Sequence, residues 1–162
     1  RIAVMKNGVI EQLDSPQKLY DNPTNKFVAS FIGTPQMNFI SGEVITQNSN
    51  KIFKSNDFKI NIESNHPQYK KLTEGNIVMG LRPEHIYDHY FAEIKNPEYT
   101  FVGEAEFIEN LGSSLIVHLS VENIKLVSQF NRNTNVEINQ KMTIIIDMNQ
   151  SHFFDNKLGH LI

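Results

Sequence analysis

Glu84, His85 and His89 come nearest, by type and spacing, to a site for chemistry. A carboxylate and two imidazoles at such short spacing can share a metal ion. Pro83 precedes His85 and the surrounding pattern is not helical, which argues against a single ligating face. The other interpretation is a polar cluster that fixes the turn after a strand, with Arg82 paired to Glu84 or a nearby carboxylate. We favour the cluster and expect no metal site.

A serine nucleophile is the second possibility. Ser113 and Ser114 follow Gly112, and His152 and His160 lie near the C-terminus. A nucleophilic serine of this kind needs a strand-turn-helix context that presents its hydroxyl, and none surrounds this pair. The stretch is instead typical of a hairpin turn. We therefore expect no catalytic residue.

Phosphate binding is disfavoured by the glycines. None of the eight glycines precedes a lysine, and no G-x-G-x-x-G occurs. Both features are needed for backbone N–H groups and a lysine to cradle phosphates. The chain also has no cysteine, which excludes disulfides, thiolate metal sites and cysteine nucleophiles. We expect this chain to bind no nucleotide or other cofactor by itself.

Composition narrows the class of protein further. The 162 residues carry 15 Lys and Arg against 18 Asp and Glu, and a net charge of -3 gives no footprint for nucleic acid. No apolar stretch approaches the roughly 20 residues that span a bilayer, and no signal peptide is evident. An apolar run follows Arg1 immediately, so we expect a fragment excised from a longer cytoplasmic protein.

Local signals predict a hairpin at the N-terminus. Residues 2–5 and 9–10 are apolar and flank Asn7 and Gly8, which accept the positive φ of a tight turn.

Two short helices are predicted next. Ser15 and Pro16 are a cap and first residue for a helix through Tyr20, and residues 22–24 restart a helix that ends at Gly33. Three-and-four spacing puts the apolar residues of the second helix on one face: Phe27, Val28, Phe31 and Ile32.

Strand patterns dominate from Phe39 onward. Residues 58–62 alternate strictly, and short β-rich apolar runs occur at 77–81, 115–119 and 143–148. Alternation puts Tyr99, Phe101, Ala105 and Phe107 on the face opposite to Glu104 and Glu106. One further short helix is expected at 67–72. The fold class predicted is mainly β, a small barrel or sandwich, divided near residues 89–97 into two halves.

Four separated motifs resemble one protein family. Residues 27–39, FVASFIGTPQMNF, closely resemble a segment of the ATPase subunits of ABC sugar importers of the MalK-like, maltose/maltodextrin type. The resemblance includes residues 5–23 upstream, GLRPEH at 80–85 and ENLG at 109–112, in the order that the family has them.

The resemblance implies fold and domains. Residues 1–35 are expected to be the C-terminal remnant of an ABC nucleotide-binding domain, and residues 36–162 a TOBE-type regulatory domain of OB-fold barrels. Gly33 would end the last helix, and Met37 and Phe39 would be apolar anchors at the junction. The ATPase motifs would lie upstream of Arg1, so the fragment is expected to be no enzyme, and ATP and Mg to belong to the parent.

Partners and location are also implied. The domain is expected to help pair two copies of the ATPase subunit. Through its parent it would meet membrane permease subunits at the inner face of the cell membrane. A phosphotransferase protein or a transcriptional regulator is a further possible partner, and nucleic acid is not expected.

Residues that match the family's motifs divide into two groups. Candidates for regulatory or dimer contacts are Lys26, Phe39, Gly75, Gly80, Gly103 and Glu109. Motif residues expected to be structural are Arg82, Pro83, Glu84, His85, Leu111 and Gly112. The glycines also have a purely structural interpretation, since glycine at a strand end often serves positive φ or a bulge. Lys26 replaces the arginine of close relatives, and residues 53–72 match poorly, which weakens the case for a regulator.

A ligand-binding module is the alternative function. OB-type barrels in relatives bind oxyanions, and unrelated ones bind single strands. The negative charge and inward aromatic positions disfavour single strands. An oxyanion or another small ligand remains the alternative.

Overall fold

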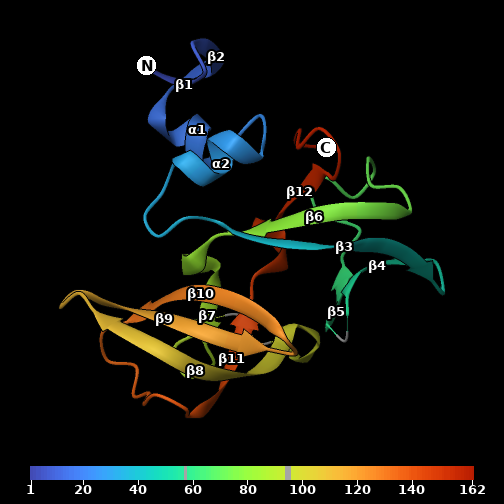
Figure 1. The fold of residues 1–162 in the computed structure, drawn as a ribbon. Coiled ribbons are helices and arrows are strands. Elements are labelled where there is room, and N and C mark those ends of the chain that lie inside the picture. Colours follow the sequence, from blue (N-terminus) through green and yellow to red (C-terminus); the bar gives the residue numbers. More distant parts are fainter. Residues whose placement is uncertain (57, 94–95) are drawn as a thin grey trace.

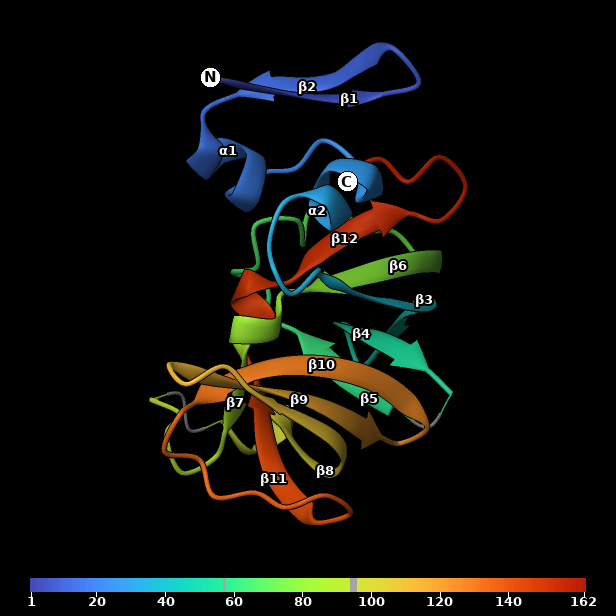
Figure 2. The ribbon, with the colours of Figure 1, turned by 60° about the vertical axis from the view of Figure 1, so that its left-hand side comes forward.

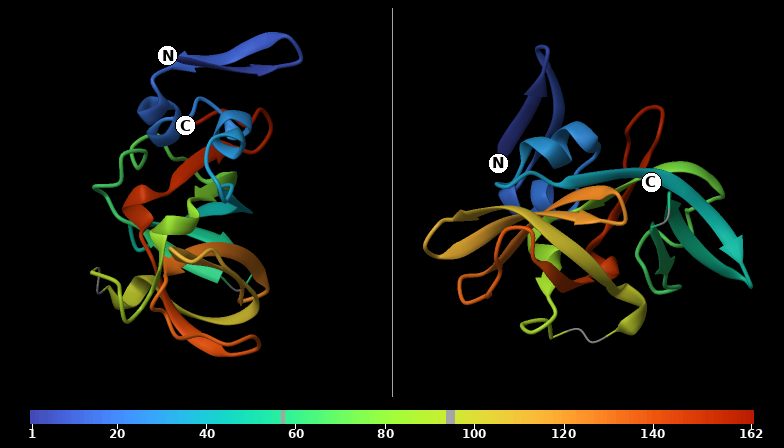
Figure 3. Two further views of the ribbon diagram at one scale, coloured as in Figure 1. Left: turned by 90° about the vertical axis from the view of Figure 1, so that its left-hand side faces the viewer. Right: turned by 60° about the horizontal axis from the view of Figure 1, so that its bottom comes forward.

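The computed structural model describes residues 1–56, 58–93 and 96–162. Within them the chain is mainly β, as predicted: a hairpin and two short helices precede two five-stranded antiparallel sheets (Figure 1). The hairpin stands at one end, the second sheet at the other, and the helices lie between the hairpin and the first sheet (Figure 2; Figure 3, left).

The N-terminal hairpin pairs β1 (Ile2–Lys6) with β2 (Val9–Asp14). Asn7 and Gly8 have φ values of 50° and 81°, which confirms the predicted turn. Much of the hairpin's apolar surface is exposed, including Ile2, Met5, Val9, Ile10 and Leu13.

Capping side chains decide where the helices begin. Helix α1 (Pro16–Asp21) starts behind Ser15, whose Oγ accepts from Lys18 N, as predicted. Helix α2 (Lys26–Phe31) starts later than predicted, because Asn25 is its cap and accepts from Val28 N at 3.0 Å. The helix buries Val28 and Ala29, whereas Phe31 is exposed and stacks on Phe27.

The first five-stranded sheet has the order β12-β6-β3-β4-β5. Its strands are β3 (Asn38–Gln47), β4 (Asn50–Ser55), β5 (Phe58–Ile62), β6 (Gly75–Leu81) and β12 (His152–Asp155).

The second sheet has the order β10-β9-β8-β11-β7. Its strands are β7 (Ile86–Asp88), β8 (Thr100–Asn110), β9 (Ser114–Val121), β10 (Ile124–Asn131) and β11 (Lys141–Ile146). Short 3-10 helices lie between strands: η1 (Pro83–His85), η2 (Pro97–Tyr99) and η3 (Met148–Gln150).

The predicted division near residues 89–97 is only partly right, because two strands cross it. Strand β7 precedes the division but pairs with β11, with Ile86 opposite Ile146. Strand β12 follows it but returns to β6, with His152 opposite Gly80. Residues of both sheets form one hydrophobic core, in which the rings of Phe58 and Phe101 stack across the sheets at 4.7 Å. The two halves are therefore a single packing unit, called the barrel below.

Two local predictions are wrong. Phe107 is exposed, since a bulge in β8 between Ala105 and Phe107 shifts the register and breaks the alternation. Residues 67–72 form successive turns where a helix was predicted. Lys51 stabilises these turns, and its Nζ donates to the carbonyl oxygens of Tyr69 at 2.7 Å and Leu72 at 2.6 Å.

Candidate functional site

Arg82 joins the helices to the barrel. It lies just after β6 and is only 1% exposed. Its Nη1 donates to the carbonyl oxygens of Ala29 (3.3 Å) and Ile32 (2.5 Å), and its Nη2 to that of Tyr20 (2.8 Å). The last carbonyls of a helix have no partner within it, and the planar guanidinium fork serves the ends of both helices at once. We call this arrangement the Arg82 clamp.

Of the two predicted partners of Arg82, the described residues show no ion pair with Glu84, whereas the nearby carboxylate of Asp21 interacts with the guanidinium charge. Glu84 accepts a hydrogen bond from the hydroxyl of Tyr20, whose ring centre lies 3.8 Å from the guanidinium carbon of Arg82. Burial lowers the pKa of Arg82 to about 10, and the Asp21 carboxylate acts in the opposite direction. The site is thus a buried cation whose Nη1 and Nη2 donate to backbone carbonyls, while its Nε has no hydrogen-bond partner among the described residues.

Gly33 has no side chain, and the guanidinium of Arg82 occupies the space where one would lie. The φ of Gly33 is 116°, and a Cβ there would lie 2.9 Å from Arg82 Nη1 and 3.3 Å from Cε2 of Tyr20. Glycine is therefore required both by the backbone and by the close approach of the guanidinium.

Apolar packing supports the same junction. Met37, Ala29, Val78 and Phe154 form a small buried cluster, and the half-buried Phe39 packs edge-on against Phe154 at 5.8 Å. The cluster connects α2 to β6 and β12.

Three of the six candidate contact residues meet at this junction. Lys26 Nζ lies 5.3 Å over the ring of Phe39. Gly80 lies in β6, and a Cβ there would be 2.6 Å from Met37 Sδ and 2.7 Å from Phe154 Cε2. Because Gly80 has no side chain, Met37 and Phe154 can pack directly against β6.

The other three candidates lie elsewhere. Gly75 is the first residue of β6 and has a φ of 135°. Gly103 lies in β8, where an added Cβ would be 3.1 Å from Cγ2 of Val121. Glu109 is half-exposed near the end of β8, with its Oε1 3.2 Å from Nε2 of His118. The structure does not bring the six residues together in one site.

The remaining motif residues occupy turns. Pro83 and His85 form η1, and Pro83 is buried. Leu111 and Gly112 form the β8–β9 turn with φ 82° at Gly112, as the hairpin interpretation predicted, and Leu111 is 60% exposed. Ser113 is part of this turn in the second sheet, whereas His152 belongs to the first.

Asn38 has a role that sequence reasoning missed. Its Nδ2 donates to the carbonyls of Leu81 (3.0 Å) and Val127 (2.8 Å), and its Oδ1 accepts from Val127 N at 2.7 Å. The side-chain amide therefore forms with β10 the pair of hydrogen bonds that a neighbouring strand would form. It thereby connects the second sheet to the first. A polar residue among apolar neighbours in MNF was the only signal.

The C-terminal segment was also missed. Gly159 O accepts from Lys26 N at 2.8 Å, and Leu161 N donates to Thr24 O at 2.9 Å. The segment consequently lies beside the start of α2 (Figure 2). Nothing in its local pattern indicates this pairing.

Sites for other chemistry are not assembled in the part of the chain that is described. No group of three His, Cys, Asp or Glu residues there is placed to hold a metal ion. No glycine precedes a lysine among the described residues, so the glycine–lysine pair of a phosphate-binding loop does not occur there. No described helix has the length and apolarity to cross a membrane.

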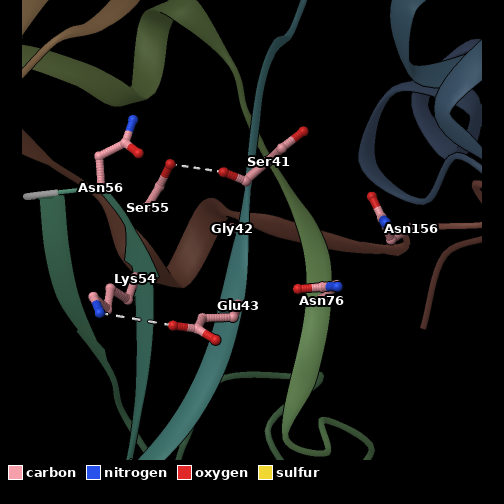
Figure 4. Close-up of a pocket in the computed structure, with 8 residues that line it drawn as sticks. All are labelled: Ser41, Gly42, Glu43, Lys54, Ser55, Asn56, Asn76 and Asn156. Carbon is pink, nitrogen blue, oxygen red and sulfur yellow. Dashed lines mark hydrogen bonds and ion pairs between the residues drawn. The ribbon is translucent and has the colours of Figure 1, made fainter.

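An open hollow of about 440 Å³ lies on the outer face of the first sheet (Figure 4). Its lining is polar, with an ion pair between Lys54 and Glu43 at 3.8 Å and a hydrogen bond from Ser55 Oγ to Ser41 O at 2.7 Å. Such a charge-balanced surface favours no particular ligand.

Comparison with known proteins identifies relatives. Residues 33–86 match the family model described as MalK OB fold domain. The chain is 36% identical over 168 residues to the trehalose/maltose import ATP-binding protein MalK of Thermococcus litoralis, with 100% of the chain and 44% of that protein covered. It is 28% identical over 162 residues to the oligosaccharides import ATP-binding protein MsmX of Bacillus subtilis, with 97% and 43% covered. The chain thus spans less than half the length of these relatives.

One solved structure is similar in fold. The cytoplasmic molybdate-binding protein ModG, solved with molybdate bound, superposes with a TM-score of 0.54 at 11% identity, covering 72% of this chain and 94% of ModG. At this identity the likeness concerns the fold alone. The matched OB-fold model and the similarity along the whole chain agree with the mainly β architecture. Residues 33–86 thus match a MalK OB fold domain, and the chain as a whole is similar to part of the ATP-binding proteins of ABC sugar importers.

Proposed function

We propose that this chain is the regulatory and dimerisation part of the ATP-binding subunit of an ABC importer for maltose, maltodextrins or a related sugar. The observation that carries the proposal is the similarity of the entire chain to two sugar-import ATP-binding proteins. The Arg82 clamp supports it, because it fixes the helices to the barrel and so allows force on one part to reach the other.

The chemistry is proposed to lie in the rest of the parent protein. There ATP and Mg would bind and ATP would be hydrolysed. The parent would dock on permease subunits at the cytoplasmic face of the membrane, and a phosphotransferase or transcriptional regulator is a further proposed partner.

Self-association is proposed to use the exposed β8–β9 turn. The side chain of Glu109 is 47% exposed there, and Leu111 is 60% exposed. Phe39 is less suitable as a contact residue, because it already packs on Phe154.

The test uses the full-length parent protein. Glu109→Lys combined with Leu111→Glu is expected to weaken self-association in light scattering and to reduce sugar-stimulated ATP hydrolysis by the assembled transporter. Leu158→Glu is the control, since Leu158 is also exposed to solvent, at 76%, but lies beyond β12. Unchanged self-association in the double variant would contradict the dimerisation role.

Substrate class is tested in cells. Removing the parent gene is expected to abolish uptake of labelled maltose or maltodextrin, and unchanged uptake of a panel of sugars would argue against the proposal. The likeness to ModG does not favour oxyanion binding by this chain. Calorimetric titration with molybdate is accordingly expected to show no binding.

A further inference from the structure

Three histidines from three elements gather beside the Arg82 clamp. A cleft of about 220 Å³ lies between α1 and the barrel, and Arg82, His85 and His152 are among its lining residues. His66 lies behind them, where its Nε2 is 3.2 Å from the carbonyl oxygen of Ser151.

The hydrogen bonds of His66 fix it as a neutral imidazole. Its Nδ1 accepts from the backbone N–H of Gln68 at 3.2 Å, while its Nε2 faces the carbonyl oxygen of Ser151 and therefore donates. The residue is only 4% exposed. A proton on Nδ1 would oppose the Gln68 N–H, so the charged form cannot keep both bonds.

His152 and His85 are also arranged for the neutral form. His152 Nε2 donates to the carbonyl oxygen of Asp21 at 2.8 Å, a bond that connects the barrel to α1. Nδ1 of His152 and Nδ1 of His85 are buried and have no hydrogen-bond partner among the described residues. Protonation would bury an N–H donor without an acceptor at His85, whereas at His152 the backbone of Gln150 offsets part of the cost of burying the charge.

The charged groups around the cluster are of both signs. His85 interacts with Glu84, His152, Arg82 and Asp21, and His152 interacts with Arg82 and Asp21. The two carboxylates favour the protonated imidazoles, whereas Arg82 and the neighbouring histidines oppose them. Burial is the largest cause for all three, and it lowers the pKa of His66, His85 and His152.

We propose that this junction is a pH-sensitive latch, which holds residues 1–35 on the barrel while His85 and His152 are neutral and releases them when these imidazoles gain protons. The geometry favours release over unfolding of the barrel. The junction core has four buried residues, Ala29, Met37, Val78 and Phe154, whereas the barrel has a far larger core of its own.

The direction of the pH effect follows from linkage. His85 and His152 line the cleft against α1 and become less buried when it is released. Each of the two therefore has a lower pKa when docked than when released, and the released form binds more protons. Docking is therefore at full strength above the ordinary histidine pKa of about 6.5 and weakens as the pH falls below it.

Hydrogen exchange by NMR on the whole chain tests the latch. The amides of Lys26 and Leu161 report on docking, because they donate across the junction to Gly159 O and Thr24 O. Between pH 7 and pH 5 their protection is expected to fall by at least about tenfold, while the amides of β9 stay protected. Simultaneous loss of protection in β9 would overturn the proposal.

Variants separate the histidines from general acid effects. His152→Gln keeps an N–H to donate to Asp21 O but does not titrate, and with His85→Gln it is expected to move the loss of protection to lower pH. His118→Gln is the control, because His118 lies exposed on β9 beside Glu109. An unchanged transition in the double variant would refute the latch.

Imidazole titration in the unmodified chain provides a second measurement that needs no variant. His85 and His152 are expected to titrate below the ordinary histidine pKa of about 6.5. Titration of both at that ordinary pKa, with the junction amides still protected, would equally refute the proposal.

Discussion

Single polar side chains hold the parts of this molecule together through backbone groups. Arg82 bonds three carbonyl oxygens of the helical segment, and Asn38 bonds backbone groups of β6 and β10. Both residues are buried. Their removal leaves buried polar groups without partners, which costs more than the bonds themselves contribute.

Arg82→Ala is expected to lower the free energy of unfolding by about 3 kcal/mol or more, because the carbonyls of Tyr20, Ala29 and Ile32 lose their donors. Urea unfolding followed by circular dichroism measures the loss. Arg132→Ala is the control, since Arg132 is exposed and its replacement should change stability by less than about 0.5 kcal/mol. Equal effects of the two substitutions would show that the clamp contributes nothing.

Asn38→Asp tests the connection between the sheets. The carboxylate accepts from Val127 N but cannot donate to the carbonyls of Leu81 and Val127, so a loss of about 2 kcal/mol is expected at pH 7. Thermal unfolding compared with Asn133→Asp, at an exposed position, isolates the effect. A smaller loss at acidic pH, where the carboxyl is protonated and donates again, is expected as well.

The sequence predicted most elements because their signals are local. Alternation predicted strands such as β5, Asn7 and Gly8 predicted the first turn, and Ser15 predicted the start of α1. Prediction from the sequence failed at Phe107 and at residues 67–72. The bulge in β8 depends on pairing with β9, and Lys51 from a distant strand satisfies the carbonyls of the turns.

Gly80 illustrates packing between elements. Gly80→Ala is expected to cost about 1 to 3 kcal/mol, since its Cβ would lie 2.6 Å from Met37 Sδ and 2.7 Å from Phe154 Cε2. Gly103→Ala is the matched control, because its nearest contact, a methyl group of Val121 at 3.1 Å, needs to move only slightly. Chemical unfolding of both variants compares them, and an equal cost at the two positions would contradict this account of Gly80.

The whole molecule is closed by segments that are far apart in the sequence. β12 returns to β6, and the segment after it pairs with the start of α2. The C-terminal segment thus meets the start of α2 at the junction that Arg82 and the histidines occupy.

Leu161→Pro removes the N–H that Leu161 donates to Thr24 O. The expected loss of docking is about 1 kcal/mol, and it should appear as faster proteolysis within residues 14–35. Leu158→Ala, at an exposed position in the same segment, should leave the cleavage rate unchanged. Unaltered cleavage of the Leu161→Pro variant would mean that this pairing does not hold the helices.

By itself the sequence determined most element types, the mainly β class and the resemblance to ABC sugar-import ATP-binding proteins, because alternation, caps, turn residues and ordered motifs occur in short stretches. Only the tertiary structure decided the partners of Arg82, the bridging role of Asn38, the exchange of β7 and β12 between the sheets, and the gathering of His66, His85 and His152. These features join residues 50 or more positions apart in several cases, as with Arg82 and Ile32 or His66 and Ser151. Such contacts depend on how the whole chain closes around one core, and no local pattern encodes that closure.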